Sequence, residues 1–128
     1  MNTLEKSAEL LGRIFLVVLF ALAAVGKLSA YAGTQAYMQS AGVPGMLLPL
    51  VIVTELGGAA LIALGWQTRI AAFLLAGFTL LAALIFHHQI GDATQQLMLL
   101  KDISITGGFL LLAARGAGPW SLDARRRR

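Results

Sequence analysis

The residues best suited to chemistry in this sequence are charged side chains that interrupt long apolar runs. They are Lys27, Glu55, Lys101 and Asp102. An ionisable side chain inside a membrane is costly, so each is expected to face other helices and to have a partner there. Glu55 follows Pro44 by eleven residues, which at about 1.5 Å per helical residue places it roughly 16 Å deep, close to the middle of a bilayer. We therefore expect Glu55 to pair with Lys27 or with Lys101.

Two interpretations of these residues stay open at the level of sequence. The first is a polar staple that fixes the order of the helices. The second is a polar pocket in which Glu55 binds or relays a proton beside a polar ligand. Consecutive helical residues point about 100 degrees apart, so Lys101 and Asp102 do not pair with each other. Lys101 shares its face with Ser104 and Gly108, the expected packing face, so we expect Lys101 to point into the pocket and keep Asp102 as a further candidate.

The two histidines, His87 and His88, are adjacent in the sequence. Adjacent side chains diverge on a helix and cannot bind one metal in the usual i, i+4 manner. Because the sequence has no other histidine and no cysteine, we predict no metal site, no haem held between two helices and no iron-sulfur cluster. The histidines are expected at the membrane interface, with His87 as a candidate for the mouth of the pocket.

Composition indicates which solvent surrounds the helices that carry these residues. Of 128 residues, 58% are hydrophobic and only 12% are charged, and the mean hydropathy is +0.78. A water-soluble domain would need far more charge on its surface. The net charge of +4 is concentrated at the end of the chain, in Arg125–Arg128, which is typical of a membrane-surface anchor and does not favour nucleic acid as a partner.

Four segments are long and apolar enough to cross the hydrocarbon layer, which takes about 20 residues. They cover approximately residues 8–30, 44–64, 70–88 and 96–114. The stretch 32–42 is short and rich in small and polar residues, and it predicts a brief interfacial helix between the first two spans. The sequence therefore predicts one all-α domain, a four-helix transmembrane bundle, followed by a basic tail at 115–128.

The basic residues favour one orientation of this bundle. With four crossings both termini lie on one side, together with Lys6, Arg13, Arg69 and Arg115. The positive-inside rule then predicts that both termini lie in the cytoplasm. Arg13 and Arg69 are interpreted as structural residues of that side, with Arg13 extending to the headgroups.

A cleavable signal peptide is the alternative interpretation of the first segment. Lys6 and Arg13 precede an apolar run, and Ala30-Tyr31-Ala32 resembles a cleavage site. Lys27 interrupts the approach to that site, however, and the length of the apolar run favours a full membrane span.

Helices already in lipid associate through close packing of small residues and through polar contacts between helices. Each predicted span supplies candidates for such packing positions. They are Leu22 and Gly26 on the first, Gly57, Gly58 and Gly65 on the second, Ala72 and Ala76 on the third, and Ser104 and Gly108 on the fourth.

A set of short motifs resembles one known family over nearly the whole chain. The motifs are Leu11-Gly12-Arg13, Gly26-Lys27, Gly42-Val43-Pro44, Glu55-Leu56-Gly57-Gly58, Thr68-Arg69, Phe86-His87, Lys101, Gly107-Gly108 and Ser121-Leu122-Asp123. In order and spacing they resemble the DoxX family. The resemblance implies a four-helix protein of the bacterial inner membrane, from a family named after a membrane subunit of a thiosulfate:quinone oxidoreductase. Where the family often has Lys-Asn in the fourth helix, this chain has Lys101-Asp102.

Three functions follow as hypotheses. The first is an accessory subunit, not catalytic alone, that binds a quinone or a similar amphiphile near Glu55 and Lys101 and supports a redox partner, which must supply the electron-transfer cofactor. The second is a small-solute or proton-coupled carrier, for which four helices require a homo-oligomer. The third is an assembly factor for other membrane proteins.

Overall fold

The computed structural model describes residues 2–87 and 91–126, and within them it contains helices and turns but no strand. Four helices are long and apolar enough to cross a membrane, which confirms the predicted all-α bundle. The elements are α1 (Thr3–Ser29), α2 (Tyr31–Ser40), the 3-10 turn η1 (Gly45–Leu47), α3 (Leu48–Leu64), α4 (Thr68–Phe86), α5 (Ala93–Arg115) and α6 (Leu122–Arg126).

Capping side chains explain where two of the spans begin. The Asn2 carboxamide accepts a hydrogen bond from the Glu5 amide at 2.8 Å, so α1 begins earlier than the predicted residue 8. The Asp92 carboxylate likewise accepts one from the Thr94 amide at 2.9 Å, so α5 begins before residue 96. Helix α4 ends at Phe86, and the last predicted residue of that span, His88, lies outside the described residues.

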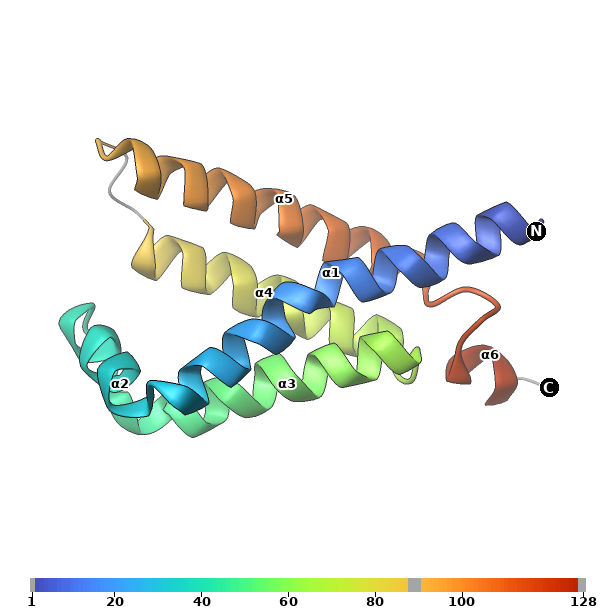
Figure 1. Ribbon diagram of the computed structural model, residues 1–128. Coiled ribbons are helices and arrows are strands. Elements are labelled where there is room, and N and C mark those ends of the chain that lie inside the picture. Colours follow the sequence, from blue (N-terminus) through green and yellow to red (C-terminus); the bar gives the residue numbers. More distant parts are fainter. Residues whose placement is uncertain (1, 88–90, 127–128) are drawn as a thin grey trace.

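The four long helices pack as two antiparallel pairs, α1 with α3 and α4 with α5, joined through α3 and α4 (Figure 1). Helices α1 and α5 make few contacts with each other. They diverge toward the end of the molecule that carries α2, and both chain termini lie at the opposite end (Figure 1). Helix α2 fills the connection between the first two spans, as the sequence predicted.

The α1–α3 pair meets along two regular stripes of buried residues. Their spacing alternates between four and three residues, the pattern that keeps one face of a helix against its neighbour. The stripes are Arg13, Val17, Phe20 and Ala24 on α1, and Leu48, Ile52, Glu55, Ala59 and Ile62 on α3. A charged residue therefore occupies a core position on each helix.

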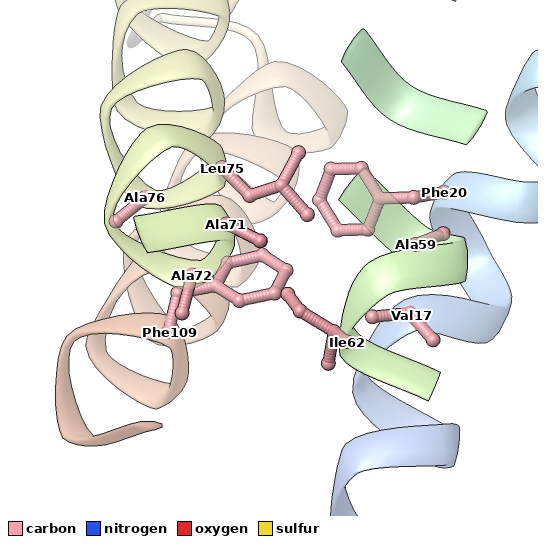
Figure 2. Packing of buried hydrophobic residues seen from close by; sticks show 9 residues of the cluster. All are labelled: Val17, Phe20, Ala59, Ile62, Ala71, Ala72, Leu75, Ala76 and Phe109. Atoms are coloured by element: carbon pink, nitrogen blue, oxygen red, sulfur yellow. The ribbon is translucent and has the colours of Figure 1, made fainter. Parts of the chain in front are cut away.

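The main core lies where both pairs meet (Figure 2). Phe20 of α1 and Phe109 of α5 pack edge to face, with ring centroids 5.2 Å apart, a favourable aromatic geometry. Ala72 and Ala76 are buried on α4, where their small side chains let α5 approach closely. The prediction that these two alanines are packing positions is confirmed.

Two adjacent glycines of α3 offer a matched test of close packing. A Cβ atom added at Gly58 would lie 2.9 Å from Cγ and Cδ1 of Leu75, whereas one added at Gly57 would meet nothing within 4 Å. Leu75 is 1% exposed and has little room to move. We expect Gly58→Ala to lower the free energy of unfolding by about 1–3 kcal/mol, measured by titration with sodium dodecyl sulfate in mixed micelles. Gly57→Ala is the control, and it should be neutral or stabilising; equal losses in both variants would contradict this packing.

The segment after α5 folds back onto the end of the bundle. The Asp123 carboxylate accepts hydrogen bonds from the amides of Gln67 and Thr68 at 2.8 and 3.0 Å and so caps the start of α4. The Asp123 amide in turn donates to the Gly65 carbonyl at 2.8 Å. Ser121 is buried. The part of the predicted basic tail that the structure describes is therefore docked on the helix ends.

Candidate functional site

An ion pair links α1 and α3 in the half of the bundle nearer α2. Lys27 Nζ donates to Glu55 Oε1 at 2.7 Å. The Glu55 side chain is 5% exposed and the Lys27 side chain 26% exposed. Of the two lysines predicted as partners of Glu55, Lys27 is the one in contact.

The two helices place these side chains opposite each other. Lys27 follows Ala24 by three residues and so continues the buried stripe of α1 into its last turn, where a cation also stabilises the end of the helix. Glu55 lies between Ile52 and Ala59 in the buried stripe of α3. Side chains lean toward the N-terminus of their own helix, and α1 and α3 are antiparallel, so the side chains of Lys27 and Glu55 lean toward each other and meet.

The ion pair forms part of the wall of a cavity of about 450 Å³. Its wall is otherwise mainly apolar and comes from α1, α2, η1, α3, α4 and the residues that join them. The lining residues are Lys27, Thr34, Tyr37, Met38, Val43, Leu47, Leu50, Val51, Thr54, Glu55, Phe78, Leu81, Ala82, Ile85, Phe86 and His87. A volume of this order suits a small ligand or the headgroup of a larger one.

Aromatic side chains join α2 to α4 on this wall. The rings of Tyr37 and Phe86 stack, with centroids 5.2 Å apart and planes 18° apart. Met38 of α2 is buried beside Leu48 and Ile52 of α3. Helix α2 thus covers part of the cavity through packed side chains.

His87 lies on the cavity wall and also contacts α5. Its Nδ1 is 2.7 Å from the Gln95 side-chain oxygen, and its Nε2 is 3.8 Å from Asp102 Oδ2. The structure therefore brings two predicted candidates, His87 and Asp102, together. Asp102 does not line the cavity but stands behind the histidine.

The expectation that Lys101 points into the pocket is wrong. Lys101 is exposed, as is Ser104, whereas Thr106 and Phe109 are buried. Helix α5 packs against α4 through the face that carries Asp102, and the adjacent Lys101 is rotated away from it by about 100 degrees. The small residue Ser104 had indicated a packing face, but its hydroxyl donates a hydrogen bond to the Leu100 carbonyl of its own helix.

Comparison with known proteins decides the family. The sequence model of the DoxX family matches residues 8–88. The chain belongs to the DoxX family. It is 48% identical over 123 residues to the inner membrane protein YqjF of Escherichia coli (strain K12), and this alignment covers 96% of this chain and 95% of that protein. It is 42% identical over 123 residues to the inner membrane protein YphA of the same organism, covering 91% and 88%. No solved structure matches the chain.

The predicted resemblance is thus confirmed, and the chain is a DoxX-family integral membrane protein. Its relatives in Escherichia coli are inner membrane proteins, in agreement with its own four apolar spans.

Arg13, one of the motif residues of this DoxX-family chain, is buried rather than extended to the headgroups, so that prediction is wrong. It is 2% exposed. Its Nη1 donates to the carbonyls of Ile62 and Ala63 at 2.9 and 3.3 Å, and its Nη2 donates to the Trp120 carbonyl. The last carbonyls of a helix lack partners within the helix. At the end of α3 the guanidinium donates to the Ala63 carbonyl and adds a second donor to the Ile62 carbonyl, which also accepts from the Gly65 amide at 3.1 Å. These contacts explain why Arg13 turns inward.

Arg69 has a related position at the end of α5. Its Nη2 donates to the Arg115 carbonyl at 3.4 Å, and the residue is exposed. Its structural role at this end of the DoxX bundle stays a prediction.

Three residues make contacts at these sites that were not predicted from the sequence, namely Gln95, Asp123 and Tyr37. Gln95 contacts His87, and Asp123 caps α4 from the far end of the chain. Neither position carries a sequence pattern that predicts its contact. Tyr37 had a signal, because an aromatic residue in a short helix beside a span is typical of a residue that packs at the membrane boundary.

Proposed function

We propose that this DoxX-family protein is an accessory membrane subunit that binds a quinone, or an amphiphile of similar chemistry, in the cavity beside Lys27 and Glu55. The single observation that carries the proposal is a buried ion pair on the wall of an otherwise apolar cavity. A quinone has the matching shape, with a small polar ring and a long apolar chain. Pockets of this kind use few polar groups to orient a mainly apolar ligand.

Lys27 is the group expected to recognise the ligand. An ammonium has several N–H donors, and the contact with Glu55 Oε1 uses one of them. Lys27 is also the more exposed member of the pair, so it can donate to a carbonyl oxygen in the cavity. Glu55 fixes its position and supplies the opposing charge.

A quinone supplies two-electron, two-proton redox chemistry when bound, and the protein around it supplies orientation and electrostatics. This chain has no cysteine and its two histidines are adjacent, so it cannot hold an electron-transfer cofactor through thiolates or through histidines on two helices. We therefore propose that a redox partner delivers the electrons. His87, with Asp102 behind it, is the group on the cavity wall suited to hold or release a proton. We also propose that both termini lie in the cytoplasm, because most basic residues lie on the side of the termini and the positive-inside rule assigns that side to the cytoplasm.

Photolabelling tests the ligand. The protein in lipid nanodiscs would be labelled with a photoreactive quinone analogue, and the adducts mapped by mass spectrometry. We expect saturable labelling on α2, α3 and α4. Ala82→Phe fills the cavity, since Ala82 lines it, and should reduce labelling at least tenfold.

Ala60→Phe is the matched control, because Ala60 is exposed on α3 and does not line the cavity. Its labelling should equal that of the wild type. Labelling that survives Ala82→Phe, or that maps only to the outer faces of the helices, would overturn the proposed ligand site. Purification in mild detergent should recover a partner that carries its own redox centre.

A further inference from the structure

A second cavity lies at the other end of α4, far along the helix from the ion pair. It has a volume of about 540 Å³ and is formed by the start of α4, the end of α5 and residues 116–119, 123 and 124. Two cations, Arg69 and Arg115, line it together with one carboxylate, that of Asp123. Both arginines come from helix ends, where the headgroups of a bilayer would lie.

The carboxylate on the wall is already engaged in the fold. Asp123 accepts hydrogen bonds from the amides of Gln67 and Thr68, so its negative charge is set against the positive end of the α4 dipole. Among the described residues, no carboxylate forms an ion pair with Arg69 or Arg115. The two guanidinium groups therefore keep their charge available for an external anion.

The backbone at Gly116 places one of these guanidinium groups. Gly116 has a φ of 84°, and a Cβ atom there would lie 3.1 Å from Nε of Arg69. The glycine lets Arg69 lie against the end of α5, where it donates to the Arg115 carbonyl. The remaining N–H groups of this planar donor suit a phosphate, which arginine binds through paired hydrogen bonds.

Exposed apolar side chains continue from the cavity along both helices. Ile70 lines it and is 61% exposed. Phe73 is four residues beyond Arg69 and Leu111 four residues before Arg115, so each shares a helix face with its arginine; they are 64% and 68% exposed. Two cations that are followed along each helix by exposed apolar side chains suit an amphiphile that has an anionic headgroup and acyl chains.

We propose that this cavity binds the phosphate of an anionic phospholipid such as phosphatidylglycerol, with the acyl chains along α4 and α5. The site is separate from the ion-pair cavity and does not depend on the function proposed for it. It joins three parts of the chain, the start of α4, the end of α5 and the docked tail, so an occupied site stabilises their arrangement.

Native mass spectrometry with defined lipids tests this site. Protein stripped of lipid in detergent would be titrated with phosphatidylglycerol, and with phosphatidylcholine as the zwitterionic comparison. We expect preferential binding of phosphatidylglycerol, and about a fivefold weaker apparent affinity in Arg115→Gln and in Arg69→Gln, from the contribution of one basic residue near anionic lipid.

Arg125→Gln is the matched control, since it removes one charge from an exposed position outside this cavity. It should bind phosphatidylglycerol as the wild type does. Equal binding of the two lipids, or an equal loss in Arg125→Gln, would overturn the proposal. A further arm adds inorganic phosphate at millimolar concentration: displacement of the lipid by phosphate alone would assign the site to a soluble anion and would also overturn it.

Discussion

Lys27→Met is expected to be among the most destabilising single substitutions in this protein. It leaves the Glu55 carboxylate, whose side chain is 5% exposed, without its ammonium partner. Removing one member of a buried ion pair typically costs about 3–5 kcal/mol, because the remaining charge stays desolvated. Titration with sodium dodecyl sulfate in mixed micelles measures the loss as a lower unfolding midpoint.

Two further variants separate the structural and functional roles of the pair. Glu55→Gln should cost less, about 1–2 kcal/mol, since the amide still accepts a hydrogen bond and Lys27 is 26% exposed. The double variant Lys27→Met, Glu55→Leu should recover most of the stability, because replacing both partners by apolar side chains is often neutral. We expect that variant to fold and yet to lose quinone labelling. If Lys27→Met and Glu55→Gln lowered the free energy of unfolding equally, that result would contradict the expectation that the more deeply buried Glu55 depends more on its partner.

Arg13→Gln is expected to release the C-terminal segment from the bundle. The guanidinium joins the carbonyls of Ile62, Ala63 and Trp120, and glutamine is too short to serve all of them. The Ile62 carbonyl keeps the Gly65 amide as a donor at 3.1 Å, but the Ala63 and Trp120 carbonyls lose Arg13. Each acceptor left without a donor costs about 1–3 kcal/mol, so we expect the free energy of unfolding to fall by about 2 kcal/mol or more.

The absence of cysteine from the sequence allows a direct measurement of this release. Ser121 is 8% exposed. The substitution Ser121→Cys would introduce a thiol there, which would be labelled with a maleimide. Labelling should be slow when Arg13 is present and at least tenfold faster with Arg13→Gln. A cysteine introduced by Arg125→Cys, at an exposed position, is the control and should react quickly in both backgrounds. Unchanged protection at position 121 would show that Arg13 does not hold this segment.

The sequence predicts the number of spans because an apolar run of about 20 residues matches the thickness of the hydrocarbon layer and is rare in water-soluble folds. It also predicts that Glu55 is buried and paired, since an isolated carboxylate at that depth is too costly. It does not decide between Lys101 and Asp102, because consecutive positions differ only in rotation and the neighbouring helix determines which one turns inward. Ser104 misled the prediction, since a small residue marks a packing face only where another helix lies opposite.

The burial of Arg13 did have a signal in the sequence. Arg13, Val17, Phe20, Ala24 and Lys27 follow one another at intervals of four and three residues, which places them on one helix face. Read as a stripe, this pattern puts Arg13 in the interface with the next span. The docking of the tail had no such signal, because Asp123 acts through backbone amides that are remote in sequence.

The stripe of α1 also has a consequence for how the protein is made. Its two cations are fourteen residues apart, about 21 Å along the helix, and both find their main partners on α3. Helix α1 is synthesised first, so during biogenesis Arg13 and Lys27 have no interaction partner until the second span emerges. The first two spans should therefore leave the insertion machinery as a paired hairpin, with the earlier span retained in a hydrated channel until the later one arrives.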